Sequence, residues 1–205
     1  MINIVDSSVI SANSSRDDCL KAIANALVNS EIIKSEDVIY YYTTIEKINI
    51  SNNLKINKYG QNAIELFHIN GSSIKIDPSS YNRYKLIITD NSVMFYLSSS
   101  YIIVIGKTIS LNEDESLGII VCSGGSWYVF TDKMNTNLTS IIPISYSLTY
   151  SRVITQLLPV CNPDGEEYFK DIFFTFMRKN TDVGMAILNN ENFYIYDNVA
   201  IRYTQ

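Results

Sequence analysis

Short runs of β-branched and aromatic residues, separated by turn residues, fill most of this 205-residue chain and constrain its fold more than any other feature. In the middle of the chain, Asp90-Asn91-Ser92 and Ser98-Ser99-Ser100 separate the runs Tyr84 to Thr89, Val93 to Leu97 and Tyr101 to Lys107. Connections this short join antiparallel neighbours, because a parallel pair needs a crossover of about a dozen residues or more. The sequence therefore predicts an antiparallel meander.

One of these runs, Tyr101 to Ile105, is apolar at nearly every position. A strand with one solvated face alternates apolar and polar residues, whereas a strand covered on both faces reads as a continuous apolar run. We therefore expect Tyr101 to Ile105 to be a central strand, in a sandwich or in a sheet covered by a helix.

Turn residues extend the strand pattern on both sides of the meander. Asn70-Gly71 stands between Ala63 to Ile69 and Ser73 to Ile76, and Asn-Gly favours the primed turn of a hairpin. Asn57 to Asn62, around Gly60, has the composition of a turn, and Asn189 to Asn192 separates the last two predicted strands before Val199 to Tyr203. Strands are thus predicted from about residue 38 to residue 203.

An amphipathic helix is predicted from about Arg16 to Asn29, with Asp17 and Asp18 near the positive end of its dipole. Its apolar face covers the following sheet or, alternatively, docks on a partner subunit. No linker rich in proline, glycine or serine divides the chain. The predicted fold is a single α+β domain over residues 1–205, predominantly antiparallel β, sandwich-like or with a helix-covered sheet.

Charge and composition bear on the class of partner. The chain has 16 basic and 21 acidic residues, scattered along its length, and a net charge of -5, which argues against a basic surface for nucleic acid. Charged residues make up only 18%, while tyrosine occurs 15 times. Tyrosine has an apolar ring with a polar tip, so it suits both half-buried strands and surfaces that become buried against another protein.

The first ten residues and the cysteines indicate the compartment. Met1 to Ile10 lacks the basic start and apolar stretch of a signal peptide, and no run reaches the roughly 18 apolar residues of a membrane span. We expect a protein that is made and kept in the cytoplasm. Cys19, Cys122 and Cys161 are odd in number and far apart, so we expect buried free thiols.

Residue patterns typical of catalysis are missing. His68 is the one histidine, in an apolar run typical of a packed or surface residue, and there is no serine elbow, phosphate-binding glycine loop or histidine pair for zinc. Glu166-Glu167 or Asp114-Glu115 would have to face a substrate from opposite sides to act as a glycosidase pair. The acidic loop Asn112 to Glu115 lacks the ligand spacing of a calcium loop. We predict no enzyme, cofactor or metal.

The order of a short helix, a tyrosine-rich meander and a closing series of strands resembles virion proteins of tailed bacteriophages, in particular collar or neck-associated proteins of contractile phages. The matching segments span most of the chain: Leu20 to Val28, Val93 to Leu97 with Tyr101 to Ile105, Glu115 to Gly118, Leu157 to Val160 with Tyr168 to Phe174, and Asn192 to Arg202.

The resemblance implies a structural component of the particle, assembled in the host cytoplasm and bound around the head-to-tail junction. Its implied partners are neck, connector or portal-proximal subunits and copies of itself, without direct contact to nucleic acid or membrane. Alternatives are a baseplate receptor- or carbohydrate-binding module, a capsid decoration protein and a small hydrolase. The predicted interface residues are aromatic, and we expect about half of them to be core: Tyr81, Tyr84, Trp127, Tyr194, Tyr196 and Tyr203.

Overall fold

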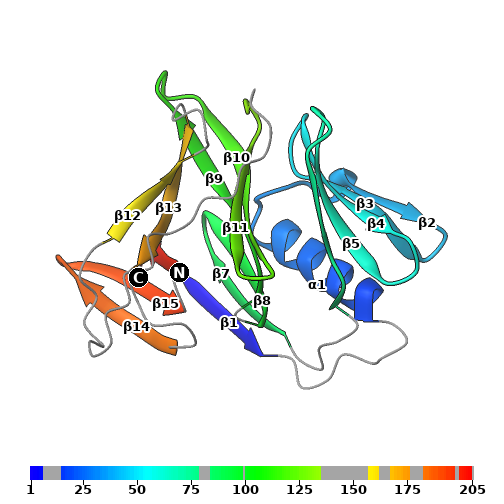
Figure 1. Cartoon of the computed structure of the whole chain (residues 1–205). Helices are drawn as coiled ribbons and strands as arrows, with labels where there is room; N and C mark the ends of the chain where they lie inside the picture. The colour runs from blue at the N-terminus through cyan, green and yellow to red at the C-terminus, as the bar shows by residue number, and fades with distance from the viewer. Residues whose placement is uncertain are drawn as a thin grey trace.

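The computed structural model describes residues 1–6, 15–78, 84–98, 100–134, 157–161, 167–175, 182–196 and 199–204. Within these ranges the chain has one α-helix, one short 3-10 helix (η1, Ser35–Asp37) and 16 strands in two antiparallel sheets (Figure 1). The fold is therefore predominantly antiparallel β with one helix, as the sequence predicts.

The smaller sheet has five strands in the order of the sequence. They are β2 (Val38–Tyr41), β3 (Thr44–Asn49), β4 (Leu54–Tyr59), β5 (Ala63–His68) and β6 (Ser73–Ile76). The predicted hairpin around Asn70-Gly71 is confirmed, with Gly71 at φ 93°. The prediction of a turn from Asn57 is wrong for its first residues, because Leu54 and Ile56 alternate with Lys55 and Asn57 and bury one face of a strand.

The larger sheet has 11 strands. They are β1 (Ile2–Asp6), β7 (Lys85–Thr89), β8 (Ser92–Ser98), β9 (Tyr101–Ser110), β10 (Glu115–Ser123), β11 (Ser126–Thr131), β12 (Leu157–Cys161), β13 (Glu167–Thr175), β14 (Asp182–Leu188), β15 (Glu191–Tyr196) and β16 (Val199–Tyr203). The antiparallel meander predicted for β7, β8 and β9 is confirmed and continues into β10 and β11.

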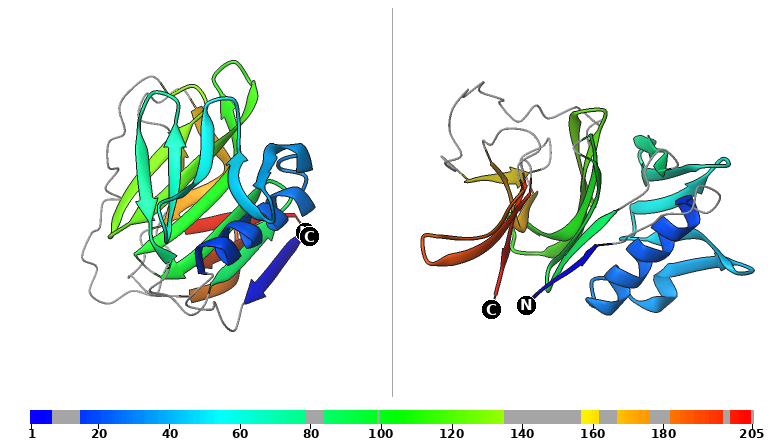
Figure 2. Two further views of the ribbon diagram at one scale, coloured as in Figure 1. Left: turned by 90° about the vertical axis from the view of Figure 1, so that its right-hand side faces the viewer. Right: turned by 90° about the horizontal axis from the view of Figure 1, so that it is seen from below.

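This sheet curls because β9 has two different neighbours along one edge. Tyr101 to Gly106 pairs with β8, whereas Thr108 to Ser110 pairs with β13. The C-terminal strands β12 to β16 therefore fold back and face the meander across a shared core (Figure 2). We call this larger sheet the curled sheet.

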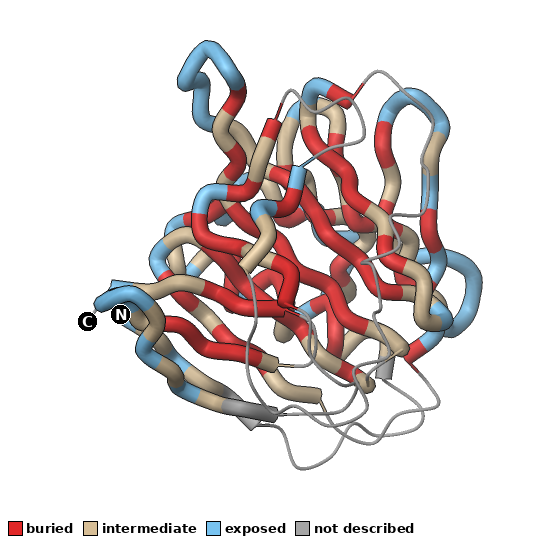
Figure 3. The backbone as a smooth tube through the Cα atoms, turned by 60° about the vertical axis from the view of Figure 1, so that its left-hand side comes forward, coloured by how far each residue is buried: buried red, intermediate tan, exposed pale blue. Residues whose placement is uncertain are grey.

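Strand β9 lies in the middle layer, between two cores. Ile103 and Ile105 join the core that α1 and the small sheet share with the curled sheet, whereas Ile102 and Val104 join the core inside the curl. All four side chains are at most 1% exposed. The prediction of a strand covered on both faces is confirmed. Figure 3 shows that the buried segments of the chain gather in the interior of the molecule.

The helix α1 (Ser15–Asn29) lies between the two sheets and contacts β3, β5 and β8 (Figures 1 and 2). Leu20, Ile23 and Leu27 are fully buried in the core there. The apolar face of the helix thus covers strands of this chain, in agreement with the first of the two uses that the sequence leaves open.

A pair of glycines allows the curl. Gly106 in β9 and Gly118 in β10 stand opposite each other in the register. A Cβ atom on Gly118 would lie 2.6 Å from Cζ of Phe169, and one on Gly106 would lie 2.7 Å from Cδ1 of Ile172. Because both neighbours belong to β13, the absence of side chains at the two glycines lets β13 pack directly over β9 and β10.

Candidate functional site

The hairpin between β2 and β3 presents a run of exposed apolar and aromatic side chains. Tyr41 pairs with Thr44, so Tyr42 and Thr43 form the turn. Ile39, Tyr40 and Tyr41 are exposed, and Tyr42 is 86% exposed. Three consecutive tyrosines in a strand and its turn cannot all face a core, because neighbouring side chains point to opposite faces.

Tyr59 is a further exposed tyrosine of the same sheet, in β4. The register pairs Lys47 of β3 with Asn57 of β4, so Tyr59 lies two residues further on, at the end of the sheet where β3 begins. The Nζ atom of Lys75 lies 3.9 Å from the centre of its ring. We call Ile39, Tyr40, Tyr41, Tyr42 and Tyr59 the tyrosine tip. Within the described residues, every tyrosine classed as exposed belongs to it.

The backbone at the tip is strained. Tyr42 has φ 53°, in the left-handed region that favours glycine or asparagine. For a residue with a Cβ atom this region costs roughly 1–2 kcal/mol. The ring of Tyr42 packs edge-on against Tyr41, with centroids 4.6 Å apart. Strained residues persist where the structure holds them in place, and they concentrate at functional sites.

A second surface feature is a groove lined by polar residues, with a volume of about 520 Å³. The strands that contribute to it, β13, β15 and β16, lie on the other side of the molecule from the hairpin of β2 and β3 (Figure 1). Four segments far apart in the sequence line the groove: the β7–β8 turn, the middle of β13, the β14–β15 turn and the end of β16. We call it the closure groove, because it lies where the curled sheet brings its first and last strands together.

Local sequence shapes two of these walls. In the β7–β8 turn, Oγ1 of Thr89 accepts a hydrogen bond of 3.0 Å from the backbone N–H of Ser92. In the β14–β15 turn, Asn189 and Asn190 have φ 52° and 65°, which asparagine tolerates well and which matches a primed hairpin turn. The turns predicted at both places are confirmed.

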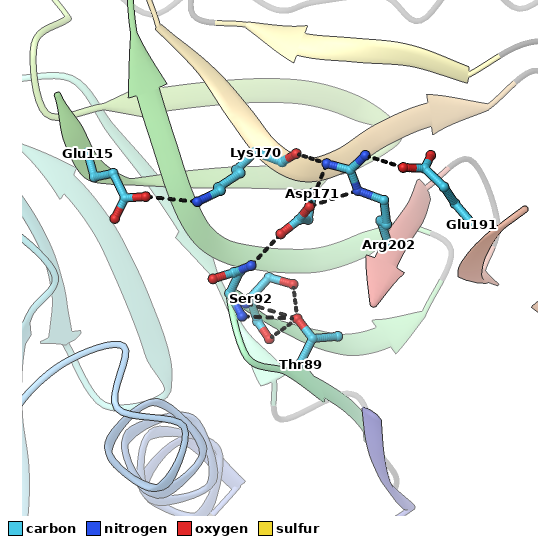
Figure 4. Close-up of polar contacts among 8 residues, drawn as sticks. Thr89, Ser92, Glu115, Lys170, Asp171, Glu191 and Arg202 are labelled. Atoms are coloured by element: carbon cyan, nitrogen blue, oxygen red, sulfur yellow. Dashed lines mark hydrogen bonds and ion pairs between the residues drawn. The ribbon is translucent and has the colours of Figure 1, made fainter. Parts of the chain in front are cut away.

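Arg202 of β16 is the centre of the groove's hydrogen-bond network (Figure 4). Its Nε donates to Oδ1 of Asp171 at 2.9 Å, and Nη1 donates to Oε1 of Glu191 at 2.7 Å. Its Nη2 donates to the backbone oxygen of Lys170 at 3.1 Å. Burial lowers the pKa of Arg202, but the hydrogen bonds to the two carboxylates outweigh it and leave the pKa above its usual value.

The network continues on both sides of Arg202. The side-chain amide of Asn91 donates to Oδ2 of Asp171, so both oxygens of this nearly buried carboxylate accept hydrogen bonds. Beside the groove, Nζ of Lys170 donates to Oε1 of Glu115 at 2.9 Å. This bond lowers the pKa of Glu115 and raises that of Lys170. The floor of the groove is therefore held by paired, charged groups.

The prediction of an interface role is wrong for two residues, Trp127 and Tyr194, because both are buried in the core. Trp127 is 5% exposed and packs edge-on against Phe174, with ring centroids 5.2 Å apart. Tyr194 is 4% exposed. Both belong to the core inside the curl, because their strands turn these positions toward the facing layer. Neither side chain is accessible to a partner.

Of the other predicted interface residues, Tyr81 lies outside the described residues. Tyr84 is half-buried against Phe95, and Tyr196 is half-buried against Tyr96. Tyr203 is half-buried and lines the closure groove. None of the predicted interface residues belongs to the tyrosine tip of the small sheet. The run Tyr40-Tyr41-Tyr42, which alternation alone excludes from a core, was the available signal.

Of the two predicted acid pairs, the structure describes both members only for Asp114-Glu115, and these two side chains pair with different lysines. Asp114 pairs with Lys133 at 3.1 Å, while Glu115 pairs with Lys170. Glu167 is fully buried, and Glu166 lies outside the described residues. Among the residues that the structure describes, no three His, Cys, Asp or Glu side chains come together as metal ligands.

The single histidine and the cysteines are mostly internal. His68 is 2% exposed, and its Nδ1 accepts a hydrogen bond of 3.1 Å from the backbone N–H of Asn70. Cys19 and Cys122 are buried, and burial, with the nearby Asp18 charge, raises the pKa of Cys19 to about 12. The expectation of a buried thiol is wrong for Cys161, which is exposed at the end of β12 after a register shift.

Comparison with known proteins finds no matching family model, curated protein or solved structure. In the described part of the chain, no helix has both the length and the apolar character needed to cross a membrane.

Proposed function

We propose that this protein is a non-catalytic binding and assembly module that docks on neighbouring protein subunits through the tyrosine tip. The observation that carries the proposal is the strained and highly exposed Tyr42, flanked by Tyr40 and Tyr41. A turn with glycine or asparagine at this position would form without the strain. The tyrosine therefore contributes something other than stability of the hairpin.

The chemistry of the tip suits a protein partner. Tyrosine combines a large rigid ring with a polar hydroxyl, and it is enriched among the residues that dominate binding energy at protein interfaces. Three residues of the tip, Ile39, Tyr40 and Tyr41, belong to β2, which is an edge strand of the small sheet. A partner with an apolar pocket and hydrogen-bond acceptors at its rim would bury the rings and satisfy their hydroxyls.

The particle to which the partner belongs is proposed from the sequence resemblance. We place the protein on a tailed bacteriophage particle, at the neck or collar, with neck, connector or portal-proximal subunits and other copies of itself as partners. A small tip makes a weak contact alone, but several copies on a symmetric particle bind with high avidity. A baseplate module or a capsid decoration protein would use the same tip at another location.

The experiment compares particles from cells that produce the protein as wild type, as a Tyr41→Ser/Tyr42→Ser double variant, or as an Ile69→Ser control. Ile69 is a matched control because it is 59% exposed, in the same sheet, at the turn between β5 and β6. Particles are separated by density-gradient sedimentation and imaged by electron cryo-microscopy. We expect wild type and control to sediment with the particles and appear as density at the neck.

The double variant should remain at the top of the gradient while keeping a wild-type circular dichroism spectrum. If wild type itself never sediments with particles, the virion role is wrong. If the double variant sediments as wild type does, the protein docks through another surface and the tip proposal is wrong.

A further inference from the structure

The closure groove is lined partly by a hydrogen-bonded network and partly by side chains outside this network. Arg202 donates hydrogen bonds to Asp171 and Glu191, and Asn91 donates one to the second carboxylate oxygen of Asp171. This network is therefore formed before any ligand binds. The groove's volume of about 520 Å³ falls within the range of small-molecule sites, which is about 300–1,000 Å³. A preformed site loses little conformational entropy when it binds.

Three other lining residues are not engaged by this network. The side chains of Asn190 and Asn192 make no hydrogen bond or ion pair with any other residue that the structure describes. Tyr203 pairs with Asn192 in the register and packs partly against the core inside the curl, but its hydroxyl has no hydrogen-bond partner among the described residues. The three residues come from the β14–β15 turn, the start of β15 and the end of β16. Each amide offers two donors and an acceptor, and the tyrosine offers a hydroxyl and a ring face.

The charge of the lining restricts the class of ligand. Asp90, Asp171 and Glu191 bring three negative charges, and Lys170 and Arg202 bring two positive ones. Because the negative and positive charges nearly cancel, the groove does not strongly attract an anion or a cation. It instead offers donors and acceptors of both kinds side by side, which suits hydroxyl groups, because a hydroxyl both donates and accepts.

We propose that the closure groove binds a neutral carbohydrate, with Asn190 and Asn192 bonding to hydroxyls and Tyr203 covering the apolar face of a sugar ring. This site goes beyond the proposed docking function, since it uses the other sheet and different residues. Binding at an open polar groove is weak for one copy and strong for many. The sugar is bound without cleavage.

The test begins with the purified full-length chain on a glycan array of neutral and acidic oligosaccharides, including bacterial wall and surface fragments. The best ligand is then titrated by isothermal calorimetry into wild type, Asn192→Ala and Asn57→Ala. Asn57 is a matched control, since it is a half-buried strand asparagine whose side chain likewise has no contact with another described residue. We expect Asn57→Ala to bind as wild type does and Asn192→Ala to bind at least ~10-fold more weakly, about 1.4 kcal/mol.

Tyr203→Phe provides a second variant that keeps the packing of the ring. It should retain binding within a few-fold, whereas Tyr203→Ala should lose it, and circular dichroism checks that each variant is folded. Binding to no oligosaccharide on the array overturns the proposal, and so does equal affinity of wild type and Asn192→Ala. Binding only to acidic glycans, or release of cleaved sugar detected by mass spectrometry, also overturns it.

The two proposals fail separately. Tyr41→Ser/Tyr42→Ser should bind the glycan as wild type does, because the tip and the groove lie on different sheets. A protein that binds glycan but never joins a particle refutes only the docking role. A protein that joins a particle through its tip but binds no glycan refutes only the groove.

Discussion

The two sheets form their surface features differently: the small sheet uses one local hairpin, and the curled sheet uses segments that are distant in the sequence. In the small sheet, the tyrosine tip is built by one hairpin, with an aromatic residue in a strained backbone conformation and rings that are largely exposed. In the curled sheet, the closure groove is built by four segments from residue 89 to residue 204, and charged groups brace one another across them. A local feature can tolerate local strain, whereas a site assembled from distant segments depends on packing and pairing throughout the sheet.

The largest expected effect tests how strongly the groove depends on the curl. Gly118→Ala should lower the free energy of unfolding by roughly 2–3 kcal/mol, because its Cβ meets Phe169, Thr108 and the fixed backbone oxygen of Phe130 within 3.0 Å. Gly106→Ala should cost less, since its nearest neighbour is the flexible end of Ile172. Urea unfolding gives both values. Equal and negligible losses would show that the glycine pair does not control the curl.

The next prediction concerns the charged floor. Arg202→Ala removes the partner of Asp171 and should lower the free energy of unfolding by about 2 kcal/mol, less than for a fully buried pair because the Arg202 side chain is 33% exposed. Lys170→Ala breaks only an exposed pair and should leave stability unchanged within error. Thermal and urea unfolding measure both. Equal stability of the two variants would mean that the network does not brace the groove.

The smallest expected effect concerns strain in the small sheet. Tyr42→Gly should raise the free energy of unfolding by about 0.5–1 kcal/mol, because glycine adopts the left-handed conformation without steric cost. Tyr40→Gly, in β2 at a position without a positive φ, should lower it by about 0.5–1 kcal/mol. The two signs should therefore differ in urea titrations of the two variants. A loss of stability in both variants would show that the backbone at Tyr42 is not strained.

Much of the fold was predictable from local patterns. The strand covered on both faces over Tyr101 to Ile105 and the hairpin around Asn70-Gly71 follow from apolar continuity and turn chemistry, which act over a few residues. Strand β4 was missed because asparagine and lysine on its outer face have the composition of a turn. Its apolar alternation spans only Leu54 and Ile56, and the pairing with β3 and β5 decides the conformation.

The candidate sites were harder to predict. Choosing among 15 tyrosines requires knowing which face each strand presents, and Trp127 and Tyr194 face inward only because the curled sheet places a second layer over them. The tyrosine tip was within reach of the sequence, because Tyr40, Tyr41 and Tyr42 are consecutive. The closure groove was not, since no local pattern relates Asn91, Asp171, Glu191 and Arg202.

The sequence by itself determined that this chain forms an antiparallel β protein with a buried central strand, because side-chain alternation and turn residues act locally. Only the tertiary structure decided that β9 is shared between β8 and β13, that a glycine pair lets the sheet curl, and that the curl creates a groove. The physical reason is that strand pairing at long separation depends on which surfaces fit together. Fit is a property of packed side chains in three dimensions and leaves no periodic signature along the chain.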